Sequence, residues 1–180
     1  EKNLLELGIP LSQPFRLQAL LTDDNEMNSW LAEGLPGDEL SVQNGMLTMR
    51  AERFPLCIDP QMQAVKWIKS REGAQLEGKI KRQTDADFLK QLELAIEYGL
   101  PFLIENVGEY IDPVLDPVLK KSFYYAPNGA KMIKLGDSEV EWDDNFRLYM
   151  TTKLPNPHYD PDVTGKTIII NYSVTELGLQ

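Results

Sequence analysis

The stretch Arg53-Phe54-Pro55-Leu56-Cys57-Ile58-Asp59-Pro60-Gln61 joins a short apolar run to the start of a helix. Residues 54–58 have the length and apolar content of a buried strand. Asp59 followed by Pro60 is typical of a helix N-cap and the first helical position, so a helix is predicted from there to about Glu72. The stretch therefore predicts a strand that leads directly into a helix, the unit from which α/β proteins are built.

The same alternation of apolar strands and helices continues along the rest of the chain. A second helix is predicted from Thr84 to Gly99, and a short broken helix at Asp112-Pro113 and Asp116-Pro117. Gly136-Asp137 predicts the turn of a surface β-hairpin. Further strands are expected at residues 77–82, 101–105, 146–152 and 167–172, and those of the hairpin at residues 132–135 and 140–142. Five apolar strands interleaved with helices predict an α/β fold whose mostly parallel sheet is covered by helices on both faces.

The first part of the chain, residues 1–53, is richer in turn formers and is expected to be a leader that packs on the α/β core of residues 54–180. Short helices are predicted at residues 15–22 and 28–33, the second ending at Gly34. Asn44-Gly45 predicts a turn between two extended pieces. Because the chain begins at Glu1 without Met, we expect it to be a segment of a longer protein.

Composition narrows the function classes. The chain has 180 residues, which suits one domain, and its net charge of −10 argues against nucleic-acid or membrane partners. A single cysteine, Cys57, cannot form a disulfide within the chain, so a reducing compartment is expected. A single histidine, His158, cannot build a histidine-based metal site. No metal and no cofactor is therefore predicted.

Chemistry in a parallel sheet is expected beyond the carboxyl ends of its strands. At the first strand end stands Asp59-Pro60-Gln61. A Walker A phosphate loop needs glycines, whose backbone N–H groups wrap the phosphates, and then Lys and Ser or Thr. None of these is present, and an Asp at the helix start repels an anion. The sequence therefore predicts a strand end without a phosphate-binding loop.

The ends of the third and fourth predicted strands carry only some of the residues that an ATPase site needs. A hydrolytic ATPase needs an acid for magnesium and a second acid to orient water, but Glu105 is followed by Asn106, a degenerate Walker B. Thr151 and Thr152 are candidates for sensing a γ-phosphate or, alternatively, for satisfying the backbone at the strand end. Gly165-Lys166-Thr167 matches the tail of a phosphate loop, but a strand follows it where the motif needs a helix. Cys57, inside an apolar strand, is predicted to be a buried, inert thiol.

Several longer motifs carry a family resemblance. They are Gly34-Leu35-Pro36-Gly37-Asp38, Ser41-Val42-Gln43-Asn44-Gly45, residues 53–61, Trp67-Ile68-Lys69, Asn106-Val107-Gly108-Glu109, residues 112–119, Leu135-Gly136-Asp137, residues 149–159 and residues 170–175. Together they resemble the fifth AAA+ module of the dynein heavy chain, from about residue 30 to the end. The run at residues 151–159 is more similar to axonemal than to cytoplasmic dyneins, while Leu56-Cys57 departs from the family's usual Leu-Met or Leu-Ile.

The resemblance implies the large α/β subdomain of an AAA+ module, with strand order 5-1-4-3-2 and a lid subdomain beyond Gln180. Dyneins are ATP-driven, minus-end-directed microtubule motors built as a ring of AAA+ modules. The fifth module is generally regarded as structural, which implies a non-catalytic relay between neighbouring modules and the stalk. The implied partners are the neighbouring modules of the same heavy chain, with the microtubule reached only through the rest of the motor. The implied location is the cytoskeleton, in the axoneme of a cilium or flagellum. The alternative is a divergent AAA+ ATPase that binds nucleotide through an atypical loop.

The resemblance also assigns positions to a vestigial nucleotide site. These are Asp59, Pro60, Gln61, Glu105, Asn106, Thr151 and Thr152. Lys166 stands where an AAA+ subunit donates an arginine finger to the preceding module's site, and a lysine supplies the charge but not a bidentate fork. The alternative for Lys166 is a strand-edge lysine that prevents unwanted strand pairing.

Overall fold

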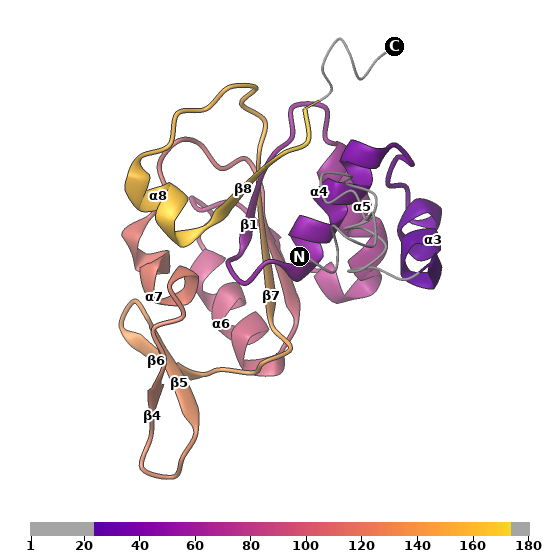
Figure 1. The fold of residues 1–180 in the computed structure, drawn as a ribbon. Coiled ribbons are helices and arrows are strands. Elements are labelled where there is room, and N and C mark those ends of the chain that lie inside the picture. The colour runs from indigo at the N-terminus through magenta and orange to yellow at the C-terminus, as the bar shows by residue number, and fades with distance from the viewer. Residues whose placement is uncertain (1–23, 174–180) are drawn as a thin grey trace, which may run out of the picture.

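A five-stranded parallel sheet forms the centre of the molecule (Figure 1). The computed structural model describes residues 24–173, so the helix predicted at residues 15–22 lies outside the described part. The strands are β1 (Pro55–Ile58), β2 (Ile80–Lys81), β3 (Pro101–Ile104), β7 (Arg147–Thr152) and β8 (Ile168–Asn171). Their spatial order is β2-β3-β7-β1-β8, and every neighbouring pair is parallel. When these five strands are counted along the chain, this is the order 5-1-4-3-2, so the predicted fold is confirmed.

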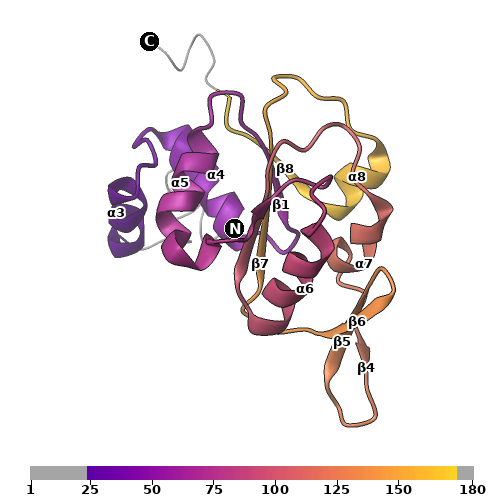
Figure 2. The same ribbon diagram turned by 180° about the vertical axis from the view of Figure 1, so that it is seen from behind.

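Helices cover both faces of this sheet (Figures 1 and 2). One face carries α3 (Asp24–Ala32), α4 (Glu39–Arg50), α5 (Gln63–Glu72) and the 3-10 helix η1 (Gly73–Leu76); the other carries α6 (Phe88–Tyr98), η2 (Pro113–Leu115), α7 (Asp116–Leu119) and α8 (Pro161–Lys166). Consecutive strand residues point to opposite faces, so Leu56 packs into one apolar cluster and Cys57 into the other. Leu148 and Met150 likewise face α6, while Tyr149 between them faces α5. The central strands β1, β3 and β7 are therefore rich in apolar residues, because both of their faces are covered.

A small antiparallel sheet projects from the body of the molecule (Figure 1). Its strands come between β3 and β7 in the chain. It consists of β4 (Tyr124–Tyr125), β5 (Lys131–Leu135) and β6 (Ser138–Glu141). The predicted β5–β6 hairpin is confirmed, and Gly136 adopts the positive φ of 61° that its turn requires. β4 was not predicted.

The prediction of a turn at Asn44-Gly45 was wrong, because both residues lie inside α4. A Cβ on Gly45 would come within 3.3 Å of Trp30 and Trp67, so a larger residue would require these rings to move by a few tenths of an ångström. The Asn44 side-chain amide donates a hydrogen bond to the backbone oxygen of Asn171 at 2.9 Å. Tertiary contacts thus override the local turn signal.

Two helix starts were also predicted too early. α5 begins at Gln63 because Asp59 to Met62 form a turn, in which Met62 has a left-handed φ of 60°. α6 begins at Phe88, not at Thr84, since the Asp85 carboxylate accepts the Arg82 N–H and forms a turn before the helix. α8 was not predicted, and it precedes the predicted strand. None of the helices within residues 24–173 is long and apolar enough to cross a bilayer.

Candidate functional site

The carboxyl ends of β1, β7 and β3 meet at one edge of the sheet, uppermost in Figure 1. Ile58 is in register with Thr152, and Ile104 with Met150. Backbone hydrogen bonds continue past the strand ends, from the N–H of Asp59 to the oxygen of Thr152 at 2.8 Å and from the N–H of Val107 to the oxygen of Thr151 at 2.9 Å. The structure therefore brings together at this carboxyl edge the strand-end positions singled out from the sequence, namely Asp59, Pro60, Gln61, Glu105, Asn106, Thr151 and Thr152.

Asp59 is the central residue of this edge. Its carboxylate accepts the N–H of Gln63 at 2.7 Å and the N–H of Val65 at 2.9 Å, and the residue is only 1% exposed. The first N–H groups of a helix are the donors that a phosphate uses in a phosphate-binding loop. Here a buried carboxylate of the chain itself already occupies two of them, and Pro60 contributes no N–H group at all. The start of α5 is thus closed to a second anion.

Glu105 follows β3 at the same edge of the sheet and pairs with a lysine of α5. Its Oε2 is 4.0 Å from the Lys69 ammonium on α5, and its backbone N–H donates to the oxygen of Lys81 at 2.9 Å. Asn106 follows in the left-handed region with a φ of 56°. In the part of the chain that the structure describes, no cluster of three or more His, Cys, Asp or Glu side chains has a metal-binding arrangement.

The two threonines at the end of β7 are buried. The Thr152 hydroxyl accepts the backbone N–H of Leu154 at 3.1 Å, and the Thr151 backbone oxygen accepts the N–H of Val107. The Thr152 hydroxyl thus satisfies a backbone N–H group where the strand ends, whereas the contact of Thr151 is made by its backbone, and a role of either residue in sensing a phosphate stays a prediction.

Cys57 confirms the prediction of a buried thiol. Burial, assisted by the negative charge of Asp59, raises the pKa of Cys57 far above its usual range. The thiol therefore stays protonated, and only a thiolate is a strong nucleophile. His158, in the exposed loop after β7, contacts Glu109 through its backbone N–H at 2.6 Å.

Comparison with known proteins places the chain in a family. A family model described as "ATP-binding dynein motor region" matches residues 28–180. The chain belongs to the dynein motor family. It is 68% identical over 172 residues to "Dynein-1-alpha heavy chain, flagellar inner arm I1 complex" of Chlamydomonas reinhardtii, and 57% identical over 180 residues to "Dynein axonemal heavy chain 10" of Homo sapiens. These matches cover 96% and 100% of the chain but only 4% of each relative, so the chain spans about 4% of their length. The resemblance to dynein heavy chains is confirmed.

Lys166 of this dynein chain lies at the opposite, amino edge of the sheet, where it ends α8 two residues before β8 begins. Its ammonium is 2.5 Å from Asp116 Oδ1 and 2.9 Å from Asp162 Oδ2, and its side chain is 3% exposed. Burial disfavours the charged form, but the hydrogen bonds to Asp116 and Asp162 raise the pKa of Lys166 overall. The ammonium is therefore held inside the chain, and contact with a neighbouring module's nucleotide stays a prediction.

An ion pair that the sequence did not predict, between a buried glutamate and an exposed arginine, ties α5 to β7. The Glu72 carboxylate accepts two hydrogen bonds from the Arg147 guanidinium, at 3.0 and 2.7 Å, and one from the Tyr149 hydroxyl at 2.5 Å. Glu72 and Arg147 are 75 residues apart, and no sequence periodicity pairs them. Their fork geometry fixes the end of α5 against the sheet.

Proposed function

We propose that this chain is the large α/β subdomain of a non-catalytic AAA+ module, the fifth, in the motor ring of an axonemal dynein heavy chain. It relays conformational change between neighbouring modules and the stalk during ATP-driven, minus-end-directed movement on microtubules. Its partners are the adjacent modules of the same heavy chain, it needs no cofactor, and the microtubule is reached only through the rest of the motor. The relatives whose names place them in flagellar or axonemal complexes support an axonemal location.

The observation that carries the non-catalytic assignment is the closed start of α5. The Asp59 carboxylate accepts the N–H groups of Gln63 and Val65 and is buried among them. A phosphate at this position would have to displace the carboxylate or lie beside it, and either arrangement costs free energy because a buried carboxylate loses its donors or faces a like charge. Asp59, Pro60, Gln61, Glu105, Asn106, Thr151 and Thr152 are then the remnants of an ancestral nucleotide site.

The relay assignment is supported by the way α4 is fastened to the last strand of the sheet. Asn44 donates to the backbone oxygen of Asn171, and the Thr48 hydroxyl lies 2.6 Å from the hydroxyl of Tyr172. Tyr172 in turn donates its backbone N–H to the oxygen of Ile58 at 2.8 Å. These buried contacts join α4, β8 and the end of β1 into one block. A block that moves as a unit transmits displacement without chemistry of its own.

Calorimetric titration of the 180-residue chain with Mg-ATP tests the proposal. We expect no micromolar binding and no amide shifts at residues 59–65 at millimolar nucleotide, with the folded state of the sample verified by its dispersed amide spectrum. A dissociation constant in the micromolar range would overturn the non-catalytic assignment and favour the divergent ATPase.

A further inference from the structure

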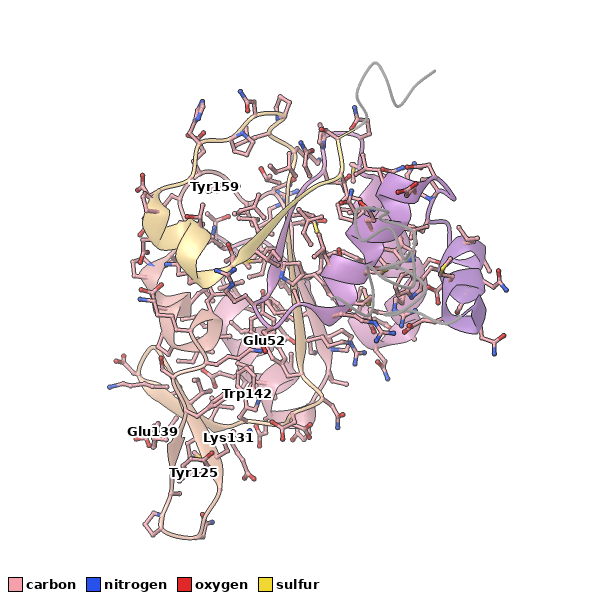
Figure 3. The ribbon with its side chains drawn as sticks, viewed as in Figure 1. Glu52, Tyr125, Lys131, Glu139, Trp142 and Tyr159 are labelled. Atoms are coloured by element: carbon pink, nitrogen blue, oxygen red, sulfur yellow. The ribbon has the colours of Figure 1, made fainter. Side chains whose placement is uncertain are left out.

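A basic pocket lies at the amino edge of the sheet, where the loop before β1 meets the last turns of α7 and α8. In Figure 3, Glu52 marks this region, while Tyr159 lies toward the opposite, carboxyl edge. The pocket encloses about 490 Å³ and is lined by Glu52, Arg53, Leu119, Lys120, Lys121, Gly165 and Lys166. This volume falls within the roughly 300–1,000 Å³ of small-molecule sites. Four of the seven lining residues are cationic in a chain whose net charge is −10.

Arg53 presents unused hydrogen-bond donors to this pocket. Its side chain is exposed, and its hydrogen bonds within residues 24–173 use only Nη1, which donates to the backbone oxygens of Thr164 at 3.3 Å and Gly165 at 3.2 Å. A guanidinium has five N–H donors in a rigid fork. The edge formed by Nε and Nη2 therefore stays available for two oxygens of one anion.

Lys121 is the second cation of the pocket that has no carboxylate partner within residues 24–173. Its ammonium donates to the backbone oxygen of Glu52 at 2.6 Å and lies 4.9 Å from the centre of the Phe54 ring. Both contacts hold the ammonium near the pocket, and neither neutralises its charge with a carboxylate. The backbone of Lys121 has a left-handed φ of 51°, a conformation that a lysine rarely adopts.

The other two cations of the pocket are already paired. Asp116 and Asp162 hold Lys166 at hydrogen-bond distance and lie 4.0 and 3.9 Å from the Lys120 ammonium. Within the described residues, Arg53 and Lys121 are thus the two lining cations without a carboxylate at ion-pair distance, and Glu52 is the one carboxylate side chain in the pocket lining. This arrangement suits a small anion that carries two or more negative charges.

We propose that Arg53 and Lys121 form a binding site for phosphate groups at the amino edge of the sheet. Arg53 binds two phosphate oxygens through its free edge, Lys121 binds as a point charge, and Glu52 weakens the interaction by like-charge repulsion. This site differs from the predicted contact through Lys166, whose ammonium is enclosed behind it. It does not rest on the proposed function, which concerns the opposite edge.

Titration of the 180-residue chain with inorganic pyrophosphate at physiological salt, followed by amide chemical shifts, tests this site. Saturable shifts are expected at residues 52–54, 119–121 and 164–166. Lys121→Met and Arg53→Gln should each weaken binding about tenfold, and Glu52→Gln should strengthen it about threefold. Lys134→Met, an exposed lysine on β5, is the matched control and should leave the affinity unchanged. If Arg53→Gln fails to fold because α8 loses its carbonyl contacts, Lys121→Met decides.

The absence of saturable shifts below about 10 mM pyrophosphate would overturn the site, as would equal weakening by Lys134→Met. A titration with ADP shows whether the site binds the phosphate groups alone or also requires a nucleoside. An affinity equal to that of pyrophosphate supports a site for phosphate groups alone, whereas binding of ADP without binding of pyrophosphate would overturn it. Shifts confined to residues 59–65 would contradict both this site and the proposed function, whereas the absence of any shifts would overturn this site and leave the proposed function intact, so the two failures are distinguishable.

Discussion

The two edges of the parallel sheet satisfy their backbone groups with side chains of opposite charge. At the carboxyl edge, N–H groups at the start of α5 are bound by the Asp59 carboxylate, which is buried in doing so. At the amino edge, backbone oxygens are bound by Arg53 and Lys121, which remain exposed. Both solutions meet the requirement that backbone groups be hydrogen-bonded. The two edges differ in what is left for a ligand. The buried carboxylate has no exposed acceptor left, whereas the exposed guanidinium and ammonium retain further N–H donors.

The largest expected effect comes from removing the carboxylate of the carboxyl edge. Asp59→Ala leaves the N–H groups of Gln63 and Val65 without their acceptor in a buried turn. We expect the free energy of unfolding to fall by about 3 kcal/mol, because two charge-assisted hydrogen bonds to the first N–H groups of α5 are lost. Urea unfolding of the 180-residue chain measures this.

Asp137→Ala is the matched control, because Asp137 is exposed in the turn between β5 and β6. It should change the free energy of unfolding by less than about 0.5 kcal/mol. Equal effects of the two substitutions would mean that Asp59 does not close the start of α5, and the contrast between the two edges would be lost.

The second largest effect on the free energy of unfolding is expected from Lys166, the buried lysine at the amino edge. Lys166→Met keeps the side-chain volume but removes the charge held by Asp116 and Asp162. Because these carboxylates are themselves partly exposed, the expected loss is about 2 kcal/mol, less than for a fully buried pair. Lys121→Met, at an exposed site, should cost less than about 0.5 kcal/mol in the same unfolding assay.

An unchanged stability of Lys166→Met would contradict the structural role of this lysine. It would then favour the prediction that Lys166 acts only toward a neighbouring module. In the full-length heavy chain, that trans role requires Lys166→Met to alter ATP use at the preceding module and at no other.

The sequence predicted correctly those features that depend on a single strand or motif. The apolar runs at β1, β3 and β7 predicted strands buried on both faces, and the family motifs implied the correct strand order. The missing glycines and lysine after β1 were also visible. The sequence did not predict that the Asp59 carboxylate closes the start of α5. This contact depends on a turn in which Met62 adopts a left-handed φ.

Contacts between distant segments account for what the sequence did not predict. Gly45 carries a local turn signal, but it lies in a helix because Trp30 and Trp67 pack against it. Lys166 finds Asp116 fifty residues earlier in the chain, and no pattern pairs the two. The basic pocket likewise combines three separate segments, so its charge is invisible in any one of them.

The smallest expected effect comes from Asp38, an exposed aspartate at the start of α4. Comparing it with Asp59 tests whether burial of the carboxylate is what makes the Asp59 contacts strong. Asp38 caps α4 as Asp59 caps α5, with its carboxylate accepting the Ser41 N–H at 2.9 Å and the Ser41 hydroxyl at 2.8 Å, but Asp38 is exposed. Asp38→Ala should therefore lower the free energy of unfolding by only about 1 kcal/mol at neutral pH.

The pH dependence of Asp38→Ala gives a second readout. Partial burial favours a higher pKa for Asp38, but the hydrogen bonds from Ser41 outweigh it and lower the pKa below 3.8 in the folded chain. A lowered folded-state pKa means that the stabilisation is present above the unfolded pKa and is lost as the pH falls through the folded pKa. The stability difference between Asp38→Ala and the unsubstituted chain should thus shrink between about pH 4 and pH 2 in urea unfolding. A difference that stays constant over this range would show that the cap acts without its charge, and exposure would then not be what separates Asp38 from Asp59.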